Sequence, residues 1–460
     1  MTDRSTNALE RSPLVVALDL ALLHACTFLV MVLVGPPMRA GDLRVYEHTF
    51  LLLSVAAMVS FSICGLYRRW SRRPLPNLVS ALFLGECLYA TAWMSLGGWD
   101  PRWAMTRGII ADAAGLQLLC LAGERILIRR IVLRGEVPQN GVIVAEDEEA
   151  GQAVRQKLAV IPGPWLSLSA CLSAEQFVRL PDQEIPWDTV LVAHDVQQKA
   201  EIVRRASQLK KSVYVVPGIL ELWMAGAHPI QIDDMLMLRL GPPHLRPGQR
   251  SIKRLADVAG SLCLLALTAP IVLVAFVLIR LTSPGPALFR QTRVGADGKE
   301  YTLYKLRTMI LGAEQHTGPV LASRKDPRVT GIGRFLRAIR ADELPQLWNV
   351  LLGEMSLVGP RPERPCFVRL LKDELPGYEF RLAVKPGITG LAQIRGRYST
   401  APELKLRFDL LYIYNYSLFM DMRILLETIL TVFQTDQTEG LEGDTGWSAL
   451  TSQTNAFSRK

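Results

Sequence analysis

Four long apolar runs near the start of the chain constrain its fold more than any other feature. Each is long enough to cross the hydrocarbon core of a bilayer, which takes about 20 residues as an α-helix. The first run has no small-residue cleavage site and is followed by Gly35-Pro36-Pro37, so we expect a retained anchor and not a removed signal peptide. The predicted spans are residues 13–34, 48–67, 77–97 and 104–124.

Charged residues in and around these runs predict how the bundle is oriented. Basic residues gather on the cytoplasmic side of membrane spans, which places both ends of the bundle in the cytoplasm. Inside the runs, Asp19, Glu86 and Asp112 are costly to desolvate, so we expect them to pair within the bundle, with a functional role as the alternative. The flanking basic residues are Arg68, Arg69, Arg72, Arg73, Arg125, Arg129, Arg130 and Arg134.

The region from 138 to 245 alternates short apolar, β-rich runs with polar helical stretches. The runs at 141–146, 188–194 and 212–218 predict strands of a small parallel, Rossmann-like α/β domain. The first run is followed by EDEEAGQ and not by GxGxxG, and acidic residues there would repel a pyrophosphate. We therefore expect a scaffold without a bound nucleotide, which could also offer a surface for a homodimer.

A fifth apolar run, residues 255–286, contains Ala269-Pro270 near its centre and has basic residues on both sides. A proline inside a helix removes a hydrogen bond and clashes with the preceding turn. A complete crossing would also carry the basic C-terminal region to the outside. These features predict a re-entrant helix over 253–281, broken at Pro270, that enters and leaves on the cytoplasmic side. A kinked full span is the alternative.

Beyond residue 290, basic side chains recur among glycines and prolines, which is typical of a phosphate site. The formal charge of +9 permits nucleic acid, anionic lipid or phosphorylated partners and does not choose among them. Pro345 predicts a helix that begins around 342–344, with Asp342 and Glu343 at its positive end. An ionised carboxylate beside bound phosphate is a plausible nucleophile, and a second one can help to hold a divalent metal. Simple helix capping is the alternative.

Five motifs from residue 253 onward, together with the Ala269-Pro270 pair, occur in an order that resembles the bacterial sugar transferase family, the polyprenyl-phosphate hexose-1-phosphate transferases. The resemblance covers about residues 250–435, and the preceding spans and α/β domain are similar to the long form of the family. The motifs are KRLADV, PALFRQTRVG, YKLRTM, DELPQLWNVLLGEMSLVGPRP and KPGITGLAQIRGR.

The resemblance implies transfer of hexose-1-phosphate from a UDP-sugar to undecaprenyl phosphate, with UMP as the leaving group. Asp342 would attack the β-phosphorus and carry the phosphosugar, and Glu343 would assist with Mg²⁺, for which both carboxylates are candidate ligands. The product would begin an exopolysaccharide, capsule or O-antigen. The implied phosphate-binding residues are Arg337, Arg361, Arg307 and Lys305, and the implied substrate or nucleotide loop contains Pro360, Pro362, Gln393 and Arg395.

The expected protein is thus a multi-pass protein of the bacterial inner membrane with its catalytic domain on the cytoplasmic face. A four-span bundle (1–137) precedes the α/β domain (138–245), a monotopic α-rich catalytic domain (246–435) and a flexible polar tail (436–460). Expected partners are membrane lipids, the two substrates and a second copy of the chain, and no nucleic acid. Two alternatives are a nucleotide-sugar epimerase or dehydratase, which needs a glycine-rich loop, and a non-catalytic assembly scaffold in which Asp342 only caps a helix.

Overall fold

The structure is a computed structural model, and its contacts divide the chain into two units, Met1–Pro217 and Gly218–Lys460, which are described separately. The predicted tail, 436–460, lies outside the described residues. The described residues are 13–34, 36–67, 70, 75–99, 105–135, 138–159, 166–181, 185–225, 227–232, 235–240, 245, 247–313, 326–396 and 400–432.

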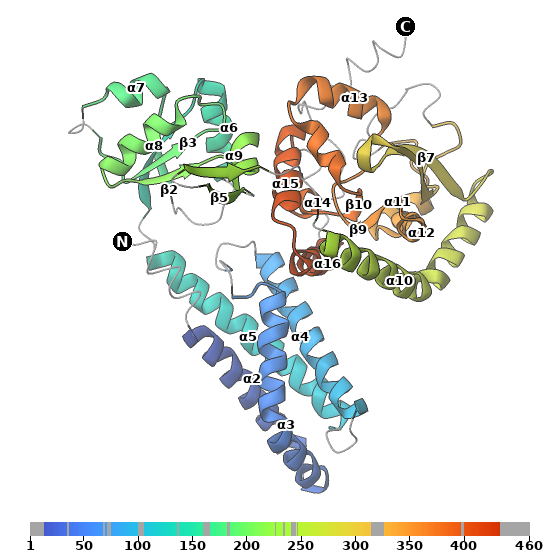
Figure 1. Ribbon diagram of the computed structural model, residues 1–460. Coiled ribbons are helices and arrows are strands. Elements are labelled where there is room, and N and C mark those ends of the chain that lie inside the picture. The colour runs from blue at the N-terminus through green and yellow to red at the C-terminus, as the bar shows by residue number, and fades with distance from the viewer. Residues whose placement is uncertain are drawn as a thin grey trace. The chain divides into compact units, whose positions relative to one another are not determined.

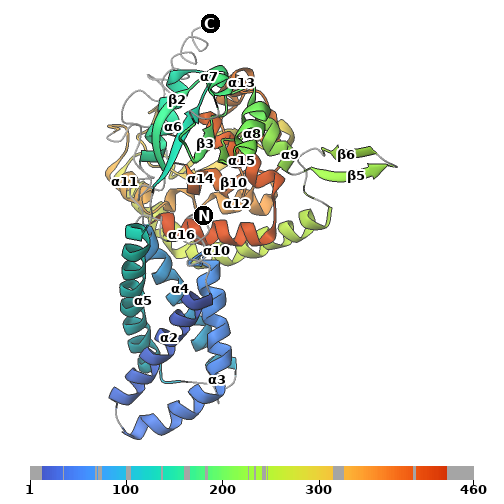
Figure 2. The same ribbon diagram turned by 90° about the vertical axis from the view of Figure 1, so that its left-hand side faces the viewer.

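The N-terminal residues form a bundle of long helices that lie side by side (Figure 2). They are α2 (Pro13–Val34), α3 (Pro36–Ile63), α4 (Leu75–Trp99) and α5 (Arg107–Gly135). In the described part of the chain, α2, α3, α4 and the later α10 (Pro247–Thr282) are long and apolar enough to cross a membrane. The fourth predicted span falls mostly within α5, which is not among these four helices; its sequence includes the charged residues Asp112, Glu124 and Arg125. A membrane crossing by α5 stays a prediction.

The ionisable residues of the bundle have different environments. Asp19 and Arg125 are fully buried and form an ion pair of 2.6 Å, and the Arg125 guanidinium lies 4.6 Å from the centre of the Trp70 ring. Asp19 therefore pairs inside the bundle as predicted. Glu86 is buried, and neither of its carboxylate oxygens has a hydrogen-bond partner among the described residues. Asp112 is exposed on the surface of α5.

The α/β domain contains a parallel sheet of four strands in the order β2-β1-β3-β4. Its three predicted strands are present, whereas β2 was not predicted. The interior is apolar because inward-facing residues such as Val144, Phe177 and Val190 pack together. The elements are β1 (Gln139–Val144), α6 (Glu148–Ala159), β2 (Leu166–Leu172), α7 (Ala174–Arg179), β3 (Thr189–Val192), α8 (Lys199–Gln208) and β4 (Ser212–Val215).

The second unit includes one helix and one hairpin from the end of the predicted α/β segment. They are α9 (Ile219–Ala225) and the hairpin of β5 (His228–Ile232) and β6 (Met235–Arg239). The domain bounds given above stay predictions. Leu222 of α9 joins the main core of this unit, and the centre of the Trp223 ring lies 5.1 Å from that of Phe380. The hairpin projects from its unit (Figure 2).

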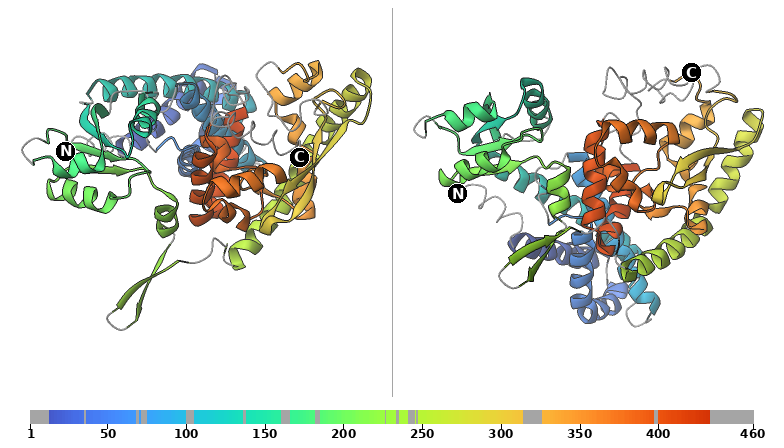
Figure 3. Two further views of the ribbon diagram at one scale, coloured as in Figure 1. Left: turned by 90° about the horizontal axis from the view of Figure 1, so that it is seen from above. Right: turned by 45° about the horizontal axis from the view of Figure 1, so that its top comes forward.

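Helix α10 spans 36 residues and stays helical on both sides of Pro270. Its path changes direction along its length in Figure 1, and Figure 3 shows the same bend from another side. An internal proline is an ordinary cause of such a bend. Ala269 and Pro270 thus lie within one continuous helix. The re-entrant course of this helix, with entry into a membrane, stays a prediction.

The N-terminal half of α10 is attached to the rest of the second unit by buried and half-buried polar contacts. Arg254 donates to the carbonyl oxygens of Val350 and Leu351 at 2.6 and 2.8 Å, and Asp257 accepts from the Leu357 amide at 3.0 Å.

The remaining elements of the second unit follow α10 along the chain. They are β7 (Leu288–Val294), η4 (Ala296–Gly298), β8 (Glu300–Leu306), α11 (Gly331–Ala338), η5 (Ala341–Glu343), α12 (Gln346–Leu352), β9 (Ser356–Val358), α13 (Pro365–Glu374), η6 (Tyr378–Ala383), β10 (Gly387–Thr389), α14 (Leu391–Arg395), α15 (Pro402–Tyr414) and α16 (Leu418–Val432).

Two small sheets and one amphipathic helix complete this unit. Strands β7 and β8 form an antiparallel hairpin, and β9 and β10 form a parallel pair. Helix α16 contributes Ile424 to the core and leaves Phe419 and Met422 exposed. Helix α16 therefore has one buried and one exposed side.

Candidate functional site

Asp342 and Glu343 lie in η5, a single turn of 3-10 helix between α11 and α12. The sequence predicted that an α-helix would begin around 342–344, but α12 begins at Gln346, after Pro345. The two carboxylates therefore precede the helix and do not form its first turn. Arg340, which leads into η5, has a left-handed backbone conformation with φ 53°. A side chain with a Cβ seldom adopts this conformation, and such strain tends to occur at functional sites.

Glu343 is paired with two cations from distant parts of the chain. Lys305 Nζ, from β8, and Arg361 Nη2 each lie 3.1 Å from the same carboxylate oxygen, Oε1. Burial disfavours the ionised form of Glu343, but the charges of Lys305 and Arg361 outweigh burial and hold the pKa of Glu343 well below its usual range. Glu343 is therefore a carboxylate at neutral pH.

The environment of Asp342 shifts its pKa in the opposite direction. Burial, followed by the neighbouring charge of Glu343, raises the pKa of Asp342 to about 6, although Lys305 and Arg337 favour its ionised form. At pH 7 the ionised form would outnumber the protonated form by about ten to one. Asp342 thus combines a negative charge at neutral pH with a higher basicity than an exposed aspartate, as a nucleophile requires.

Arg337 is positioned by the close contact of α11 with the segment that follows β8. The Thr330 hydroxyl caps α11 by accepting from the Gly333 amide at 3.0 Å. A Cβ at Gly333 would lie 2.1 Å from the carbonyl oxygen of Thr308, so only glycine allows this approach. At the other end of the helix, Arg337 Nε donates to Thr308 Oγ1 at 2.9 Å. The guanidinium of Arg337 is thereby placed near Asp342, whose charge it favours.

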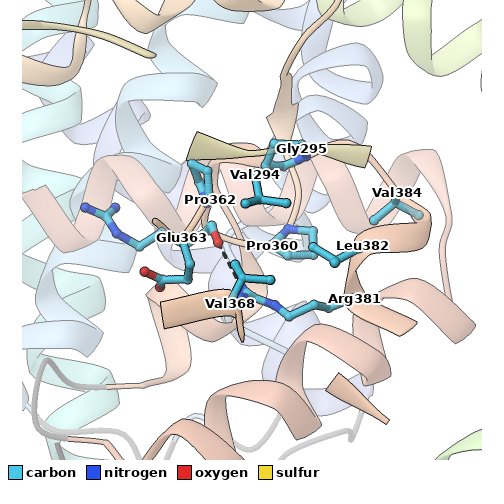
Figure 4. Close-up of a pocket in the computed structure, with 11 residues that line it drawn as sticks. Val294, Gly295, Pro360, Pro362, Glu363, Val368, Arg381, Leu382 and Val384 are labelled. Atoms are coloured by element: carbon cyan, nitrogen blue, oxygen red, sulfur yellow. Dashed lines mark hydrogen bonds between the residues drawn. The ribbon is translucent and has the colours of Figure 1, made fainter. Parts of the chain in front are cut away.

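Arg361 belongs to a loop, Pro360–Glu363, that borders a pocket (Figure 4). Its side chain is 43 % exposed. The pocket is lined by apolar residues together with Arg361, Glu363 and Arg381. Its lining residues are Val294, Gly295, Pro360, Arg361, Pro362, Glu363, Val368, Arg381, Leu382, Val384 and Pro386.

The structure separates the predicted site residues into two groups. Lys305, Arg337, Asp342, Glu343 and Arg361 come together, and Pro360 and Pro362 flank Arg361.

The other three residues have contacts elsewhere. Arg307 is buried and donates to the carbonyl oxygens of Ser283 and Pro284 at 2.9 and 2.7 Å, which fixes the turn after α10. Gln393 donates to the Ile388 carbonyl oxygen at 3.0 Å, and Arg395 pairs with Glu427 of α16 at 2.8 Å. Neither Gln393 nor Arg395 is among the described residues that line the pocket.

Three residues around the Arg361 loop were not predicted as site residues. Arg293 lies within the QTRVG motif, so its position among the recurring basic motifs was a usable signal. Arg381 and Asp409 lie outside all the motifs, and they form a buried ion pair of 2.9 Å. Nothing in the spacing of the sequence links two residues that are brought together only by the fold.

Asp342 and Glu343 also form the candidate metal site. Among the described residues there is no group of three or more His, Cys, Asp or Glu side chains that could hold a metal. Mg²⁺ in phosphoryl-transfer sites takes one or two carboxylates together with substrate phosphate oxygens and water. The two carboxylates of η5 fit this arrangement, with the remaining ligands supplied by the substrate and by water.

Comparison with known proteins identifies the same region of the chain. A family model described as bacterial sugar transferase matches residues 248–435. The UDP-glucose:undecaprenyl-phosphate glucose-1-phosphate transferase of Caulobacter vibrioides is 43 % identical over 219 residues, which are 45 % of this chain and 81 % of that relative. The UDP-galactose-lipid carrier transferase of Erwinia amylovora is 27 % identical over 461 positions, 92 % of this chain and 94 % of that relative.

Coverage differs among the other similar proteins. The UDP-N-acetylgalactosamine-undecaprenyl-phosphate N-acetylgalactosaminephosphotransferase of Aeromonas hydrophila is 41 % identical over 206 residues, and the chain spans only 48 % of its length. The Caulobacter relative is matched over most of its length. Together with the family model, this match shows that the chain belongs to the bacterial sugar transferase family.

Proposed function

We propose that this protein is a phosphoglycosyl transferase that moves a sugar phosphate from a UDP-sugar to undecaprenyl phosphate. One observation carries the proposal: the Asp342–Glu343 turn lies within a cluster of cations formed by Lys305, Arg337 and Arg361. Such a cluster can bind a diphosphate while leaving one carboxylate ionised and ready to react. The names of the relatives support the substrate class.

The proposed reaction has two displacements at one phosphorus atom. In the first, an Asp342 carboxylate oxygen forms a bond to the β-phosphorus of the UDP-sugar, and the bond from this phosphorus to the bridging oxygen breaks, so UMP leaves. In the second, a phosphate oxygen of undecaprenyl phosphate attacks the same phosphorus and frees Asp342. The products are UMP and undecaprenyl-diphospho-sugar. The covalent step divides one difficult transfer into two easier ones.

The roles of the other residues follow from their charges. Arg361 and Arg337 hold the donor phosphates and stabilise the negative charge that accumulates on the transferred group. Lys305 keeps Glu343 ionised, which leaves Glu343 available with Asp342 as a ligand for Mg²⁺. When bound, the metal would neutralise charge on the diphosphate.

The location of the acceptor determines where this chemistry takes place. A lipid phosphate lies at the height of the headgroups, so the catalytic unit would rest on the cytoplasmic face of the bacterial inner membrane. Exposed apolar residues of α10, among them Leu267, Leu273 and Leu281, support a membrane location for this helix. The lipid-linked product would be the first intermediate of a surface polysaccharide.

The experiment follows the two half-reactions separately. Detergent-purified protein is mixed with Mg²⁺ and a panel of UDP-sugars without acceptor, and released UMP and protein mass are measured. The true donor should release about one UMP per protein and leave a phosphosugar on the protein, because the intermediate accumulates. Undecaprenyl phosphate should then remove the adduct and allow turnover.

The Asp342→Asn variant tests the assigned nucleophile. We expect it to lower UMP release by roughly a thousandfold or more and to form no adduct. Asp373→Asn, at an exposed position of α13, is the matched control and should behave as the wild type. An adduct on the Asp342→Asn protein would disprove the role of Asp342, and a scaffold function would be indicated if no donor released UMP from the wild type.

A further inference from the structure

We propose that Arg381 is a positioning residue, which sets Arg361 in the site by holding the backbone carbonyl oxygen of that residue. The inference rests on the proposed function and concerns the same site. Arg381 Nη2 donates to the Arg361 carbonyl oxygen at 2.9 Å, and the dashed line in Figure 4 marks a hydrogen bond between residues of this pocket. Arg381 does not need to touch a substrate in order to act in this way.

The loop that carries Arg361 is held by its backbone at every residue from 360 to 363. Each of the four carbonyl oxygens accepts a hydrogen bond from another part of the chain. Two of the donors are backbone amides, and the other two are guanidinium groups of buried or half-buried arginines. In the order of the acceptors Pro360, Arg361, Pro362 and Glu363, the donors are Gly387 N, Arg381 Nη2, Arg293 Nη1 and Val294 N, at 2.9, 2.9, 2.9 and 3.0 Å.

Arg381 is itself fixed on the side away from the loop. Its Nε and Nη2 lie 3.1 and 2.9 Å from Asp409 Oδ2, and its Nη1 donates to the Tyr378 hydroxyl. The side chain is 7 % exposed, so these contacts lie in a medium where charge-assisted hydrogen bonds are strong. A planar guanidinium held at several of its donors has little freedom, and it therefore sets the position of the carbonyl oxygen that it binds.

This anchoring matters because the side chain of Arg361 lies at the surface. A half-exposed arginine on a free loop has many rotamers and loses substantial conformational entropy when it binds a phosphate. Fixing the backbone at residue 361 limits the region that the guanidinium can reach, and the ion pair with Glu343 then sets its direction. A displacement of about 1 Å in such a group can lower the rate about a hundredfold.

A buried Arg–Asp pair is not the simplest way to fill a protein core. Desolvating two charges costs free energy, and apolar residues of similar volume often stabilise a fold equally well. If Arg381 had a purely structural role, replacing it would lower the rate by the same factor whether residue 361 is arginine or lysine. A positioning role predicts that the effect of replacing Arg381 depends on the residue at 361.

The test is a double-mutant cycle with Arg381→Lys and Arg361→Lys. Lysine keeps the charge at 381 but cannot donate to Asp409, Tyr378 and the loop together. Arg381→Lys should lower kcat/KM for UMP release about a hundredfold in the wild type, but less than about threefold when residue 361 is already lysine. Arg407→Lys is the matched control, because Arg407 is buried, pairs with Glu403 and has no hydrogen bond to residues 360–363 among the described contacts.

A second measurement does not depend on activity. Amide hydrogen exchange in peptides that cover 359–364 should become about tenfold faster in Arg381→Lys, with little change elsewhere in the catalytic unit and none in Arg407→Lys. Effects of the two substitutions that multiply, or faster exchange throughout the unit, would overturn the positioning role. If the wild type releases no UMP from any donor, the proposed function fails, and the exchange pattern still decides whether Arg381 anchors this loop.

Discussion

The α/β domain and the catalytic unit have interiors of different character. In the described parts of the sheet domain, 138–159, 166–181 and 185–217, Thr189 is the one buried polar side chain. The catalytic unit, Gly218–Lys460, instead buries many ionisable side chains. They are Lys253, Asp257, Arg307, Asp326, Arg381, Arg407, Asp409 and Asp421.

The difference shows what each interior is built to do. An apolar sheet interior gains its stability from burial alone and sets no particular distances between charges. Buried charges need partners with good geometry, and in the catalytic unit the buried Arg381–Asp409 pair holds the backbone of the Arg361 loop. The comparison predicts that polar substitutions will have much larger effects in the catalytic unit than in the sheet domain.

The largest expected effect is on stability, in Asp409→Ala. Removing the carboxylate leaves the buried guanidinium of Arg381 without a negatively charged partner, and the free energy of unfolding should fall by about 3–5 kcal/mol. Denaturant unfolding in detergent, with the exposed Asp373→Ala as control, measures the loss. A loss below about 1 kcal/mol would mean that the pair is not a determinant of this interior.

Replacing Glu343 with Gln tests the charge balance of the site. The amide keeps the shape of the side chain but leaves Lys305 and Arg361 without the negative charge between them. We expect kcat for UMP release to fall about 10²–10³-fold, as when one charge-stabilising group is removed from an active site. Glu374→Gln, on the exposed side of α13, is the control. An unchanged kcat would show that Glu343 has no part in the transfer.

The pH dependence of kcat/KM should follow the raised pKa of Asp342. Only the ionised carboxylate can attack, so the rate should be near its plateau above the pKa of about 6 and fall about tenfold for each pH unit below it. The measurement is the initial rate of UMP release at constant ionic strength between about pH 4.5 and 8, a range that extends roughly two pH units to either side of that pKa. A rate that stays constant down to the lowest pH would contradict the assignment.

The smallest expected effect is that of Thr189→Val in the sheet domain. This change removes a 2.8 Å hydrogen bond from the hydroxyl to Gln139 Oε1 and leaves the volume almost unchanged. The cost should be about 1 kcal/mol of unfolding free energy, with no change in UMP release. A large loss of activity would show that the two interiors are coupled more closely than their composition indicates.

The sequence was informative wherever a pattern is local. Hydropathy located the bundle helices and α10, and alternating apolar and polar runs located β1, β3 and β4. The sequence did not reveal β2, because its side chains alternate between half-buried and exposed and include serines. The packing of α9 on α15 could not be predicted either, because it joins residues nearly 200 positions apart and leaves no local pattern.

The candidate site was predictable in its charges but not in its geometry. The motifs identified Asp342, Glu343 and Arg361, and the structure adds the 3.1 Å contacts that join Glu343 to Lys305 and Arg361. Arg307 illustrates the limit of composition. A basic residue in a phosphate-like context can equally donate to backbone carbonyl oxygens, as Arg307 does at Ser283 and Pro284.

The hydrogen bonds that attach α10 to the segment around α12 affect how a membrane could move the candidate site. Arg254 and Asp257 tie the base of α10 to the segments on either side of Gly353, close in sequence to the carboxylate turn. If α10 is seated in lipid, a thinner or thicker bilayer would raise or lower the whole catalytic unit together. The distance of the candidate site from the bilayer centre would then depend on the lipid, while the distances between its reacting groups would not.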